Sequence, residues 1–496
     1  MDTDEKIKRI PYLFAKKHGV VATEVSSENK IILYHLPGIK MQTIAEVKRV
    51  LNCEIQLKLV NGDEFQHHLS HFYQSQSAII EATESMEDDL YLMQLATKVP
   101  NSEDLLDSQN DAPIIKLINA LFTQAIKQKA SDIHIETYEN KVLIRNRLDG
   151  VLHEILEIQP KIAPFVISRV KVMAKLDIAE KRIPQDGRIS LKIGGHNIDV
   201  RVSTLPSNHG ERIVLRILDK KSAQLDLSLL GMPNDTLKKI KKMISEPHGI
   251  LLVTGPTGSG KTTSLYAMLT ELNEVTRNIL TIEDPIEYDL PGIGQTQVNS
   301  KVNMTFARGL KAILRQDPDV VMIGEIRDIE TSEIAIQASL TGHLVLSTLH
   351  TNSALGALTR LKDMGVESFL LSSSIIGVLA QRLVRKLCGN CKTEYELNDD
   401  EISILQAILK DNEDIPPIYK PNGCESCNFS GYKGRTGIYE LIPVDETLQG
   451  MIHRQESLQT MEEYIRPTVT SIREDGCKRV LLGETSITEI LRVTSA

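Results

Sequence analysis

The sequence predicts an α/β protein whose largest part is a doubly wound parallel sheet, and three observations support this prediction. A short apolar run, residues 249–254, ends in a glycine-rich loop and leads into helical sequence. Similar apolar runs at 278–282, 319–323 and 344–349 follow at helix-long intervals. Each of these runs ends in charged or polar residues. Strands that alternate with helices form parallel sheets, so we expect these charged residues at one edge of such a sheet.

Length and composition set the limits on the class of protein. A chain of 496 residues with 41% hydrophobic and 25% charged residues predicts a soluble protein of about three domains. No apolar stretch reaches the roughly 18 residues of a membrane span, and the first residues are acidic, so we expect a cytoplasmic protein.

The net charge and the aromatic content indicate which kinds of partner the protein can bind. The net charge of −9, the absence of tryptophan and the 4% aromatic content argue against a nucleic-acid groove, so we expect no nucleic-acid partner. The basic cluster at 382–386 could contact a partner, but a solvated face is the better interpretation.

The chain begins with a small mixed α/β domain at residues 1–75, where we expect a helix at 11–18 and a strand at 54–60. No catalytic constellation lies there, so it is either a docking module or a stabilising appendage. A linker at 76–112 follows, because residues 81–111 hold nine acidic residues against one basic residue, Lys98. Its apolar middle, 89–96, predicts a short docked helix.

A second domain is expected at 113–225. It opens with an amphipathic helix at 114–126, and alternating apolar and polar residues then predict a sheet covered on one face. The predicted strands are 132–136, 142–147, 188–192, 198–202 and 213–218. The sheet domain around the glycine-rich loop takes up the remainder, 226–496.

The glycine-rich loop has the pattern of a phosphate-binding loop. Its glycines let backbone N–H groups converge on phosphate oxygens, and the following helix adds positive charge at its N-terminus. Lys261 can reach the β- and γ-phosphates, and the Thr262 hydroxyl can ligate magnesium. The nucleotide-binding residues predicted here are Gly255, Pro256, Thr257, Gly258, Ser259, Gly260, Lys261, Thr262 and Thr263.

Acidic residues end two of the predicted strands. Glu283 follows the run at 278–282, and Glu325 follows the run at 319–323. Phosphoryl transfer needs a carboxylate that orders magnesium and a group that orients water. We expect Glu325 to serve magnesium and Glu283 to serve the water, although the assignment could be reversed. For Glu287 and Asp328, a solvated or helix-capping role is as good an interpretation.

Histidines stand at both ends of the run at 344–349. His343 and His350 could sense the γ-phosphate or order the water, and we take His350 as a catalytic candidate. Packing is the alternative role for a histidine in such a position.

Two C-x₂-C pairs, Cys388/Cys391 and Cys424/Cys427, are separated by 32 residues. In a cytoplasmic protein four thiolates suit tetrahedral zinc better than two disulfides. Four protein ligands leave no position open for water, so the predicted zinc is structural and defines a subdomain at 386–430. The alternative is that the pairs do not share one ion.

Together the phosphate loop, the 283–287 acidic box, the 324–328 strand end and the 343–350 segment resemble the secretion ATPase superfamily of type II secretion and type IV pili. The chain is most similar to the type II secretion assembly ATPases, the general secretion pathway protein E family. The resemblance implies a RecA-like ATPase domain, a PAS-like second domain, and ATP, Mg²⁺ and Zn²⁺ as cofactors. It also implies that Arg201 and Arg216 of the second domain complete the ATP site.

For partners, the resemblance implies a homohexamer that powers pseudopilus assembly and protein export. The first domain would dock on the cytoplasmic part of an inner-membrane secretion protein, which would hold the ATPase peripherally at that membrane. An inner-membrane platform protein would receive the motion, and acidic phospholipid is a further candidate partner. Two alternatives stay open: a pilus-extension ATPase, which shares every catalytic motif, and a nucleic-acid motor, which would need a basic channel.

Overall fold

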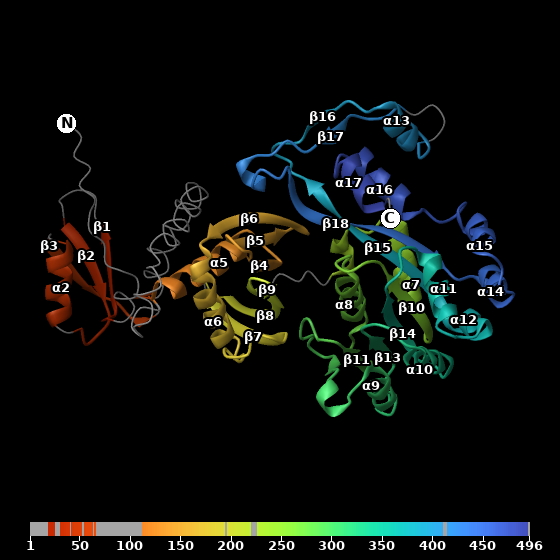
Figure 1. Ribbon diagram of the computed structural model, residues 1–496, viewed down its shortest axis with the longest axis horizontal. Coiled ribbons are helices and arrows are strands. Elements are labelled where there is room, and N and C mark those ends of the chain that lie inside the picture. Colours follow the sequence, from red (N-terminus) through yellow and green to blue (C-terminus); the bar gives the residue numbers. More distant parts are fainter. Residues whose placement is uncertain are drawn as a thin grey trace. The chain divides into compact units, whose positions relative to one another are not determined.

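The computed structural model describes residues 18–24, 30–39, 41–51, 54–62, 64–65, 112–193, 196–219, 226–409 and 414–494. The chain forms two compact units, residues 1–100 and 101–496 (Figure 1). No helix among the described residues is both long enough and apolar enough to cross a membrane.

The first unit is built on a three-stranded sheet, β1 (Val20–Glu24), β2 (Lys30–His35) and β3 (Glu54–Leu59), with one helix, α2 (Met41–Leu51). Strand β2 is antiparallel to β1 and parallel to β3. A small core contains Val20, Leu33, Val47 and Phe65. The strand expected at 54–60 is therefore present. Most of the helix expected at 11–18, and the whole of that expected at 89–96, lie outside the described residues.

The second unit opens with a six-stranded antiparallel sheet in the order β6-β5-β4-β9-β8-β7. Helices α5 and α6 lie together on one face of this sheet, as Figure 1 shows. The elements are α5 (Ala112–Lys127), β4 (Asp132–Thr137), β5 (Val142–Leu148), β6 (Val151–Ile158), α6 (Ala163–Met173), β7 (Gln185–Ile193), β8 (His196–Ser207) and β9 (Gly210–Asp219).

All five strands predicted for this sheet are present, whereas β6 was missed. The pairing of β5 with β6 shifts register between Ile144 and Arg145, so β6 does not keep the strict alternation on which the prediction relied.

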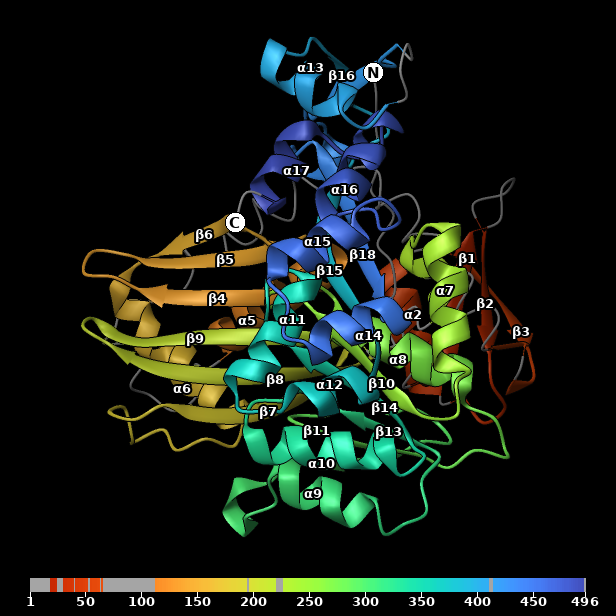
Figure 2. The ribbon, with the colours of Figure 1, turned by 90° about the vertical axis from the view of Figure 1, so that its right-hand side faces the viewer.

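A seven-stranded sheet follows in the order β12-β11-β13-β14-β10-β15-β18. Figure 2 shows helices on both sides of it. Its strands are β10 (Gly249–Thr254), β11 (Ile279–Glu283), β12 (Gly294–Gln297), β13 (Val320–Ile323), β14 (Leu344–Leu349), β15 (Ile375–Leu387) and β18 (Tyr432–Pro443). Strands β10, β13 and β14 are buried at every position, which explains why they read as uninterrupted apolar runs.

Helices cover both faces of this sheet, as a doubly wound fold requires. The core on one face includes residues of α9 (Phe306–Ile313), α10 (Ile329–Leu340), α11 (Ala354–Asp363), α12 (Ser368–Ser374), α14 (Glu446–His453) and α15 (Leu458–Ile465). The core on the other face includes residues of α7 (Asn234–Ile244) and α8 (Lys261–Leu272). The predicted parallel sheet needs one correction, because the edge strand β18 is antiparallel to β15.

Strands β15 and β18 form a long ribbon that leads to the cysteine pairs. It packs against α16 (Ile472–Leu481) and α17 (Ile487–Thr494), and a small module carries β16 (Thr393–Tyr395), α13 (Asp399–Gln406) and β17 (Ile418–Lys420).

The interpretation of 382–386 as a solvated basic face is wrong for Arg382. This side chain is buried in β15 and donates to the carbonyl oxygens of Asn352 and Val493.

Candidate active site

The phosphate loop joins β10 to α8, where the sequence predicted it. Gly255 and Gly260 have φ values of +148° and +87°, which disfavour any residue with a side chain. A Cβ on Gly255 would also collide with the carbonyl oxygen of Gln381 on the neighbouring strand β15. Residues 256–258 are exposed, so the loop presents its backbone to solvent at the N-terminus of α8.

Lys261 is the first residue of α8 and is buried. Its Nζ donates to the carbonyl oxygens of Gly255 at 2.7 Å and Pro256 at 3.1 Å, and so lies folded over the loop. Burial lowers the pKa of Lys261 to about 8, although the charge of Glu325 opposes this shift. The ammonium group is therefore poorly compensated, which favours an anion at the loop.

Glu325 lies beyond the end of β13, close enough to Lys261 to influence its pKa. Its carboxylate forms an ion pair with Arg327 and lies 3.5 Å from Nε2 of His350. Burial, and then the charge of Lys261, lower the pKa of His350, which favours the neutral imidazole. Arg327 was not among the predicted site residues, although it follows Glu325 by only two positions.

The two histidines do not act as a pair. His350 stands at the carboxyl end of β14, beside Glu325, whereas His343 precedes the amino end of the strand. Six strand residues separate them by about 20 Å. His343 hydrogen-bonds with the carbonyl oxygen of Ala338 at 2.8 Å and with the Thr341 hydroxyl, which gives it a packing role.

Glu283 ends β11 and is buried, with 3% of its surface exposed. Its carboxylate accepts hydrogen bonds from Tyr266 of α8, from Thr281 at 2.6 Å and from Gln295 of β12 at 3.0 Å. Glu283 thus lies deeper than Glu325, in a network of neutral donors. Tyr266 and Gln295 were not among the predicted site residues, because nothing in the local sequence marks either of them as a partner of Glu283.

The other two acidic candidates have separate roles. Asp328 caps the N-terminus of α10 by accepting a hydrogen bond from the backbone N–H of Thr331 at 2.8 Å. This is the helix-capping role that the sequence offered for Asp328. Glu287 instead forms an ion pair at 3.0 Å with Arg201, a residue of the six-stranded sheet. Arg201 also donates to the carbonyl oxygen of Ile286 at 2.7 Å.

Arg201 and Arg216 are directly opposite each other on β8 and β9. Arg216 is more exposed and donates to Asp132 at 3.0 Å. Together with Arg188 and Pro285 they line a cavity of about 400 Å³. Pro285 belongs to the loop that follows Glu283, so the arginines of the six-stranded sheet face a space bordered by the acidic box. The charged groups that line this space are three arginines and the Asp186 carboxylate, so their net charge is positive and suits an anionic ligand.

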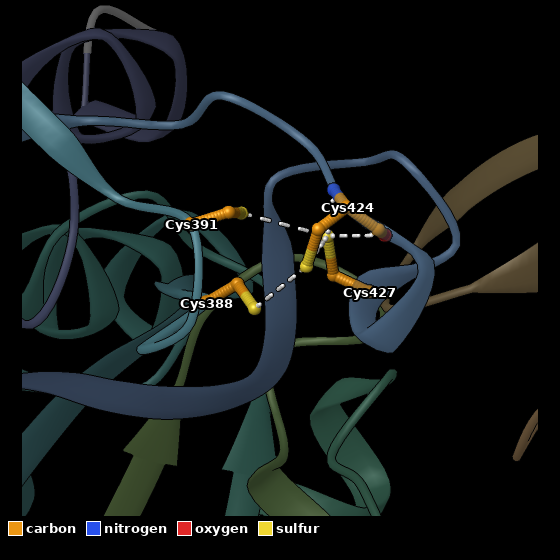
Figure 3. A group of neighbouring side chains, drawn as sticks. All are labelled: Cys388, Cys391, Cys424 and Cys427. Atoms are coloured by element: carbon orange, nitrogen blue, oxygen red, sulfur yellow. Dashed lines mark hydrogen bonds between the residues drawn. The ribbon is translucent and has the colours of Figure 1, made fainter. Parts of the chain in front are cut away.

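The cysteines form a second, separate site (Figure 3). The four Sγ atoms of Cys388, Cys391, Cys424 and Cys427 all lie within 4.8 Å of one another, so the two pairs come together. Sγ–Sγ distances of 3.7–3.8 Å are found for Cys388–Cys424, Cys391–Cys427 and Cys424–Cys427. A tetrahedral zinc ion with Zn–S bonds of about 2.3 Å spaces its sulfurs about 3.8 Å apart, so the group fits zinc.

Backbone N–H groups support two of these four sulfurs, those of Cys391 and Cys427, as thiolates. Gly423 donates to Cys391 at 3.3 Å, while Cys424 and Gly431 donate to Cys427 at 3.2 and 3.3 Å. Burial alone would raise the pKa of the Cys427 thiol, but the N–H donors and the neighbouring cysteines lower it to about 7. Burial raises the pKa of the Cys424 thiol to about 11, so Cys427 is the sulfur of this pair that loses its proton first. A thiolate is the form that binds a metal.

Comparison with known proteins assigns the chain to a family. A family model described as "Type II/IV secretion system protein" matches residues 107–492, and a second model, which describes a domain of "GSPII protein E", matches residues 9–73. The chain therefore belongs to the type II/IV secretion system protein family.

Individual relatives narrow this class. The chain is 55% identical to the "Type II secretion system ATPase E" of Vibrio cholerae over 99% of this chain and 97% of the relative. It is also 55% identical to the "Type II secretion system protein E" of Aeromonas hydrophila, over 98% and 97%. The predicted membership among the type II secretion ATPases is thus confirmed.

A solved structure agrees with the fold. The crystal structure of the pilus retraction motor PilT with bound ADP is similar over 76% of this chain and 96% of that chain, with 26% identity and a TM-score of 0.52. This match confirms the α/β fold.

Proposed function

We propose that the protein hydrolyses ATP at the phosphate loop to power pseudopilus assembly and protein export by a type II secretion system. The observation that carries the proposal is the convergence of Lys261, Glu325 and His350 from one helix and two neighbouring strand ends. Parallel strands bring these residues to the carboxyl edge, where nucleotides bind. The identity to a type II secretion ATPase favours this function over pilus extension.

Each residue of the site receives a role that its position supports. The loop 255–263 binds the phosphates, and Lys261 would exchange its carbonyl partners for the β- and γ-phosphates. Thr262, exposed at the start of α8, and Glu325 would hold Mg²⁺. Glu283 would orient the attacking water, and His350, beside Glu325, would sense the γ-phosphate.

Arg201 and Arg216 would complete the site from the six-stranded sheet. They line the cavity bordered by Pro285, and a guanidinium stabilises charge that develops on the transferred phosphoryl group. Their contacts with Glu287 and Asp132 would be exchanged for the nucleotide as the second domain moves against the ATPase domain. Such a movement would be the mechanical output.

The cysteine group would hold one structural Zn²⁺. All four ligand positions are protein sulfurs, so the ion would have no open site for a substrate and would instead stabilise the end of the β15–β18 ribbon.

The protein would assemble as a homohexamer. Its first domain would dock on the cytoplasmic part of an inner-membrane secretion protein, and an inner-membrane platform protein would receive the motion.

Purified full-length protein should release phosphate from ATP only when Mg²⁺ is present. Vesicles with acidic phospholipid should stimulate this release, whereas single-stranded DNA should not. Stimulation by DNA and not by vesicles would favour a nucleic-acid motor. If the protein releases no phosphate from ATP with Mg²⁺, whether alone, with vesicles or with single-stranded DNA, the proposed activity is contradicted.

A further inference from the structure

Tyr266 lies at the junction of three parts of the ATPase domain. It belongs to α8, the helix that begins with Lys261, and its side chain is fully buried. The phenol oxygen donates to Oε2 of Glu283 at the end of β11 and accepts from the backbone N–H of Glu287 at 3.2 Å. One hydroxyl group therefore links the phosphate-loop helix, a strand end and the acidic loop.

Tyr266 also has a defined relation to the phosphate loop. It follows Thr262 by four residues, so the two side chains lie on the same face of α8, one turn apart. Thr262 is exposed at the loop, while Tyr266 reaches inward to Glu283. The helix thus fixes the distance between the loop and the carboxylate that Tyr266 holds.

The other donors to Glu283 act on the opposite oxygen. Thr281 and Gln295 both donate to Oε1, at 2.6 Å and 3.0 Å. Among the described residues, Tyr266 is the hydrogen-bond donor to Oε2, and none of the ion pairs in this part of the chain involves Glu283. A buried carboxylate that has only neutral donors depends on each of them for its orientation.

The phenol is suited to this task. Burial, and then the hydrogen bond to Glu283, raise the pKa of Tyr266, so it stays a protonated donor. Its ring is held edge-on by Tyr288, at 6.2 Å between centroids. The loop it anchors also carries the Glu287 carboxylate that pairs with Arg201.

We infer that Tyr266 is a positioning residue for ATP hydrolysis, which holds the Glu283 carboxylate at a fixed place relative to Lys261 and Thr262. The inference rests on the proposed role of Glu283 in orienting water. Tyr266 itself does not touch the nucleotide. It acts through Oε2 of Glu283 and, through the Glu287 N–H, on the loop that faces Arg201.

The test is Tyr266→Phe in the full-length protein, because phenylalanine keeps the ring and removes only the hydroxyl. We expect kcat to fall about tenfold, the usual scale for one hydrogen bond to a charged group, with KM for ATP changed less than about twofold. In a Glu283→Gln background the same substitution should cause no further loss, since it acts through that carboxylate.

Two controls separate positioning from general damage. Tyr439 is also buried in the same domain, and its hydroxyl donates to the Leu230 carbonyl at 2.8 Å, remote from Glu283 in the hydrogen-bond network. Tyr439→Phe should lower the melting temperature without changing kcat. Turnover is normalised to the sites that bind a fluorescent ATP analogue, so partial unfolding cannot imitate the effect.

The outcomes are distinguishable. If Glu283→Gln is inactive but Tyr266→Phe turns over normally, the inference is wrong and the proposed function stands. If the losses of the two variants multiply in the double variant, Tyr266 does not act through Glu283. If Glu283→Gln hydrolyses ATP at the wild-type rate, Glu283 does not orient the water, and the inferred positioning role of Tyr266 is wrong as well.

Discussion

The phosphate loop and the cysteine group lie in the same chain, and they differ in how completely their polar groups are satisfied. At the loop, residues 256–258 and Thr262 are exposed, and within the described part of the chain the Lys261 ammonium group donates to carbonyl oxygens alone. At the cysteine group, four sulfurs face one another, and backbone N–H groups donate to those of Cys391 and Cys427. An incompletely satisfied site can bind and release a substrate, whereas a closed site stabilises structure.

Strand β15 connects the two regions. Gln381, near its middle, accepts a hydrogen bond from Ser264 of α8 at 2.7 Å, and Cys388 follows its last residue, Leu387. The contrast between the two sites predicts that substitutions in the phosphate loop abolish ATP hydrolysis and leave the zinc content unchanged. Substitutions of the cysteines should lower the zinc content and leave hydrolysis largely unchanged.

The largest effects are expected at the acidic strand ends. Glu325→Gln and Glu283→Gln should each lower kcat by about a hundredfold or more, because an amide cannot accept a proton or neutralise magnesium as a carboxylate does. Nucleotide binding, measured with a fluorescent ATP analogue, should change little. Wild-type rates in both variants would remove the two residues from the catalytic site.

Arg201 and Arg216 should come next. Arg201→Ala and Arg216→Ala should lower kcat about tenfold to a hundredfold with smaller changes in ATP affinity, because guanidinium groups stabilise charge that develops in the transition state. Arg182→Ala is a matched control, since Arg182 is an exposed arginine in the same domain that pairs with Glu180. Normal hydrolysis in both test variants would mean that the second domain does not complete the site.

A smaller effect is expected from pH. Because burial lowers the pKa of Lys261 to about 8, the ammonium form predominates below that pH and is lost above it. The ratio kcat/KM, which reports the free enzyme, should therefore fall about tenfold per pH unit above this point. Bound phosphates hold the charge on Lys261, so kcat should fall less. A kcat/KM that stays constant up to about pH 10, near the ordinary lysine value, would contradict this assignment.

The smallest effect on basal turnover is expected at the metal group. Cys424→Ser should make residues 387–431 more sensitive to proteolysis and reduce zinc content, while basal kcat falls less than about threefold. Coupling to partners should suffer more than hydrolysis. Cys477→Ser is the control, because Cys477 is buried but lies outside the cysteine group. Equal proteolysis of the Cys424 variant and wild type would show that the group does not stabilise this segment.

The features that could be predicted from the sequence are those that depend on local patterns of residues. The phosphate loop, the buried strands at 249–254 and 344–349, and the two C-x₂-C pairs are each written in a few consecutive residues. The phosphate loop and the residues that follow β13 and β14 meet at one edge of the sheet, because these strands are parallel. For the same reason the fold class was predictable except for the antiparallel edge strand β18, whose direction depends on the long excursion through the cysteine module.

Contacts between distant segments could not be predicted in this way. Tyr266 and Gln295 meet Glu283 from other elements, and Arg201 meets Glu287 across 86 residues. Arg382 looked like part of a surface cluster, yet partners at Asn352 and Val493 allow it to be buried. His343 and His350 looked like a pair because they flank one strand, and the length of that strand separates them.

The most direct test of the contrast between an open reactive site and a closed structural one is a paired measurement on Lys261→Ala. Phosphate release and zinc content are determined in the same purified samples of the variant and of wild type. We predict no Mg²⁺-dependent phosphate release from the variant, together with about one zinc per chain in both proteins. Retained hydrolysis in Lys261→Ala would contradict the assignment of the chemistry to this loop, and freshly purified protein without zinc would contradict the closed metal site.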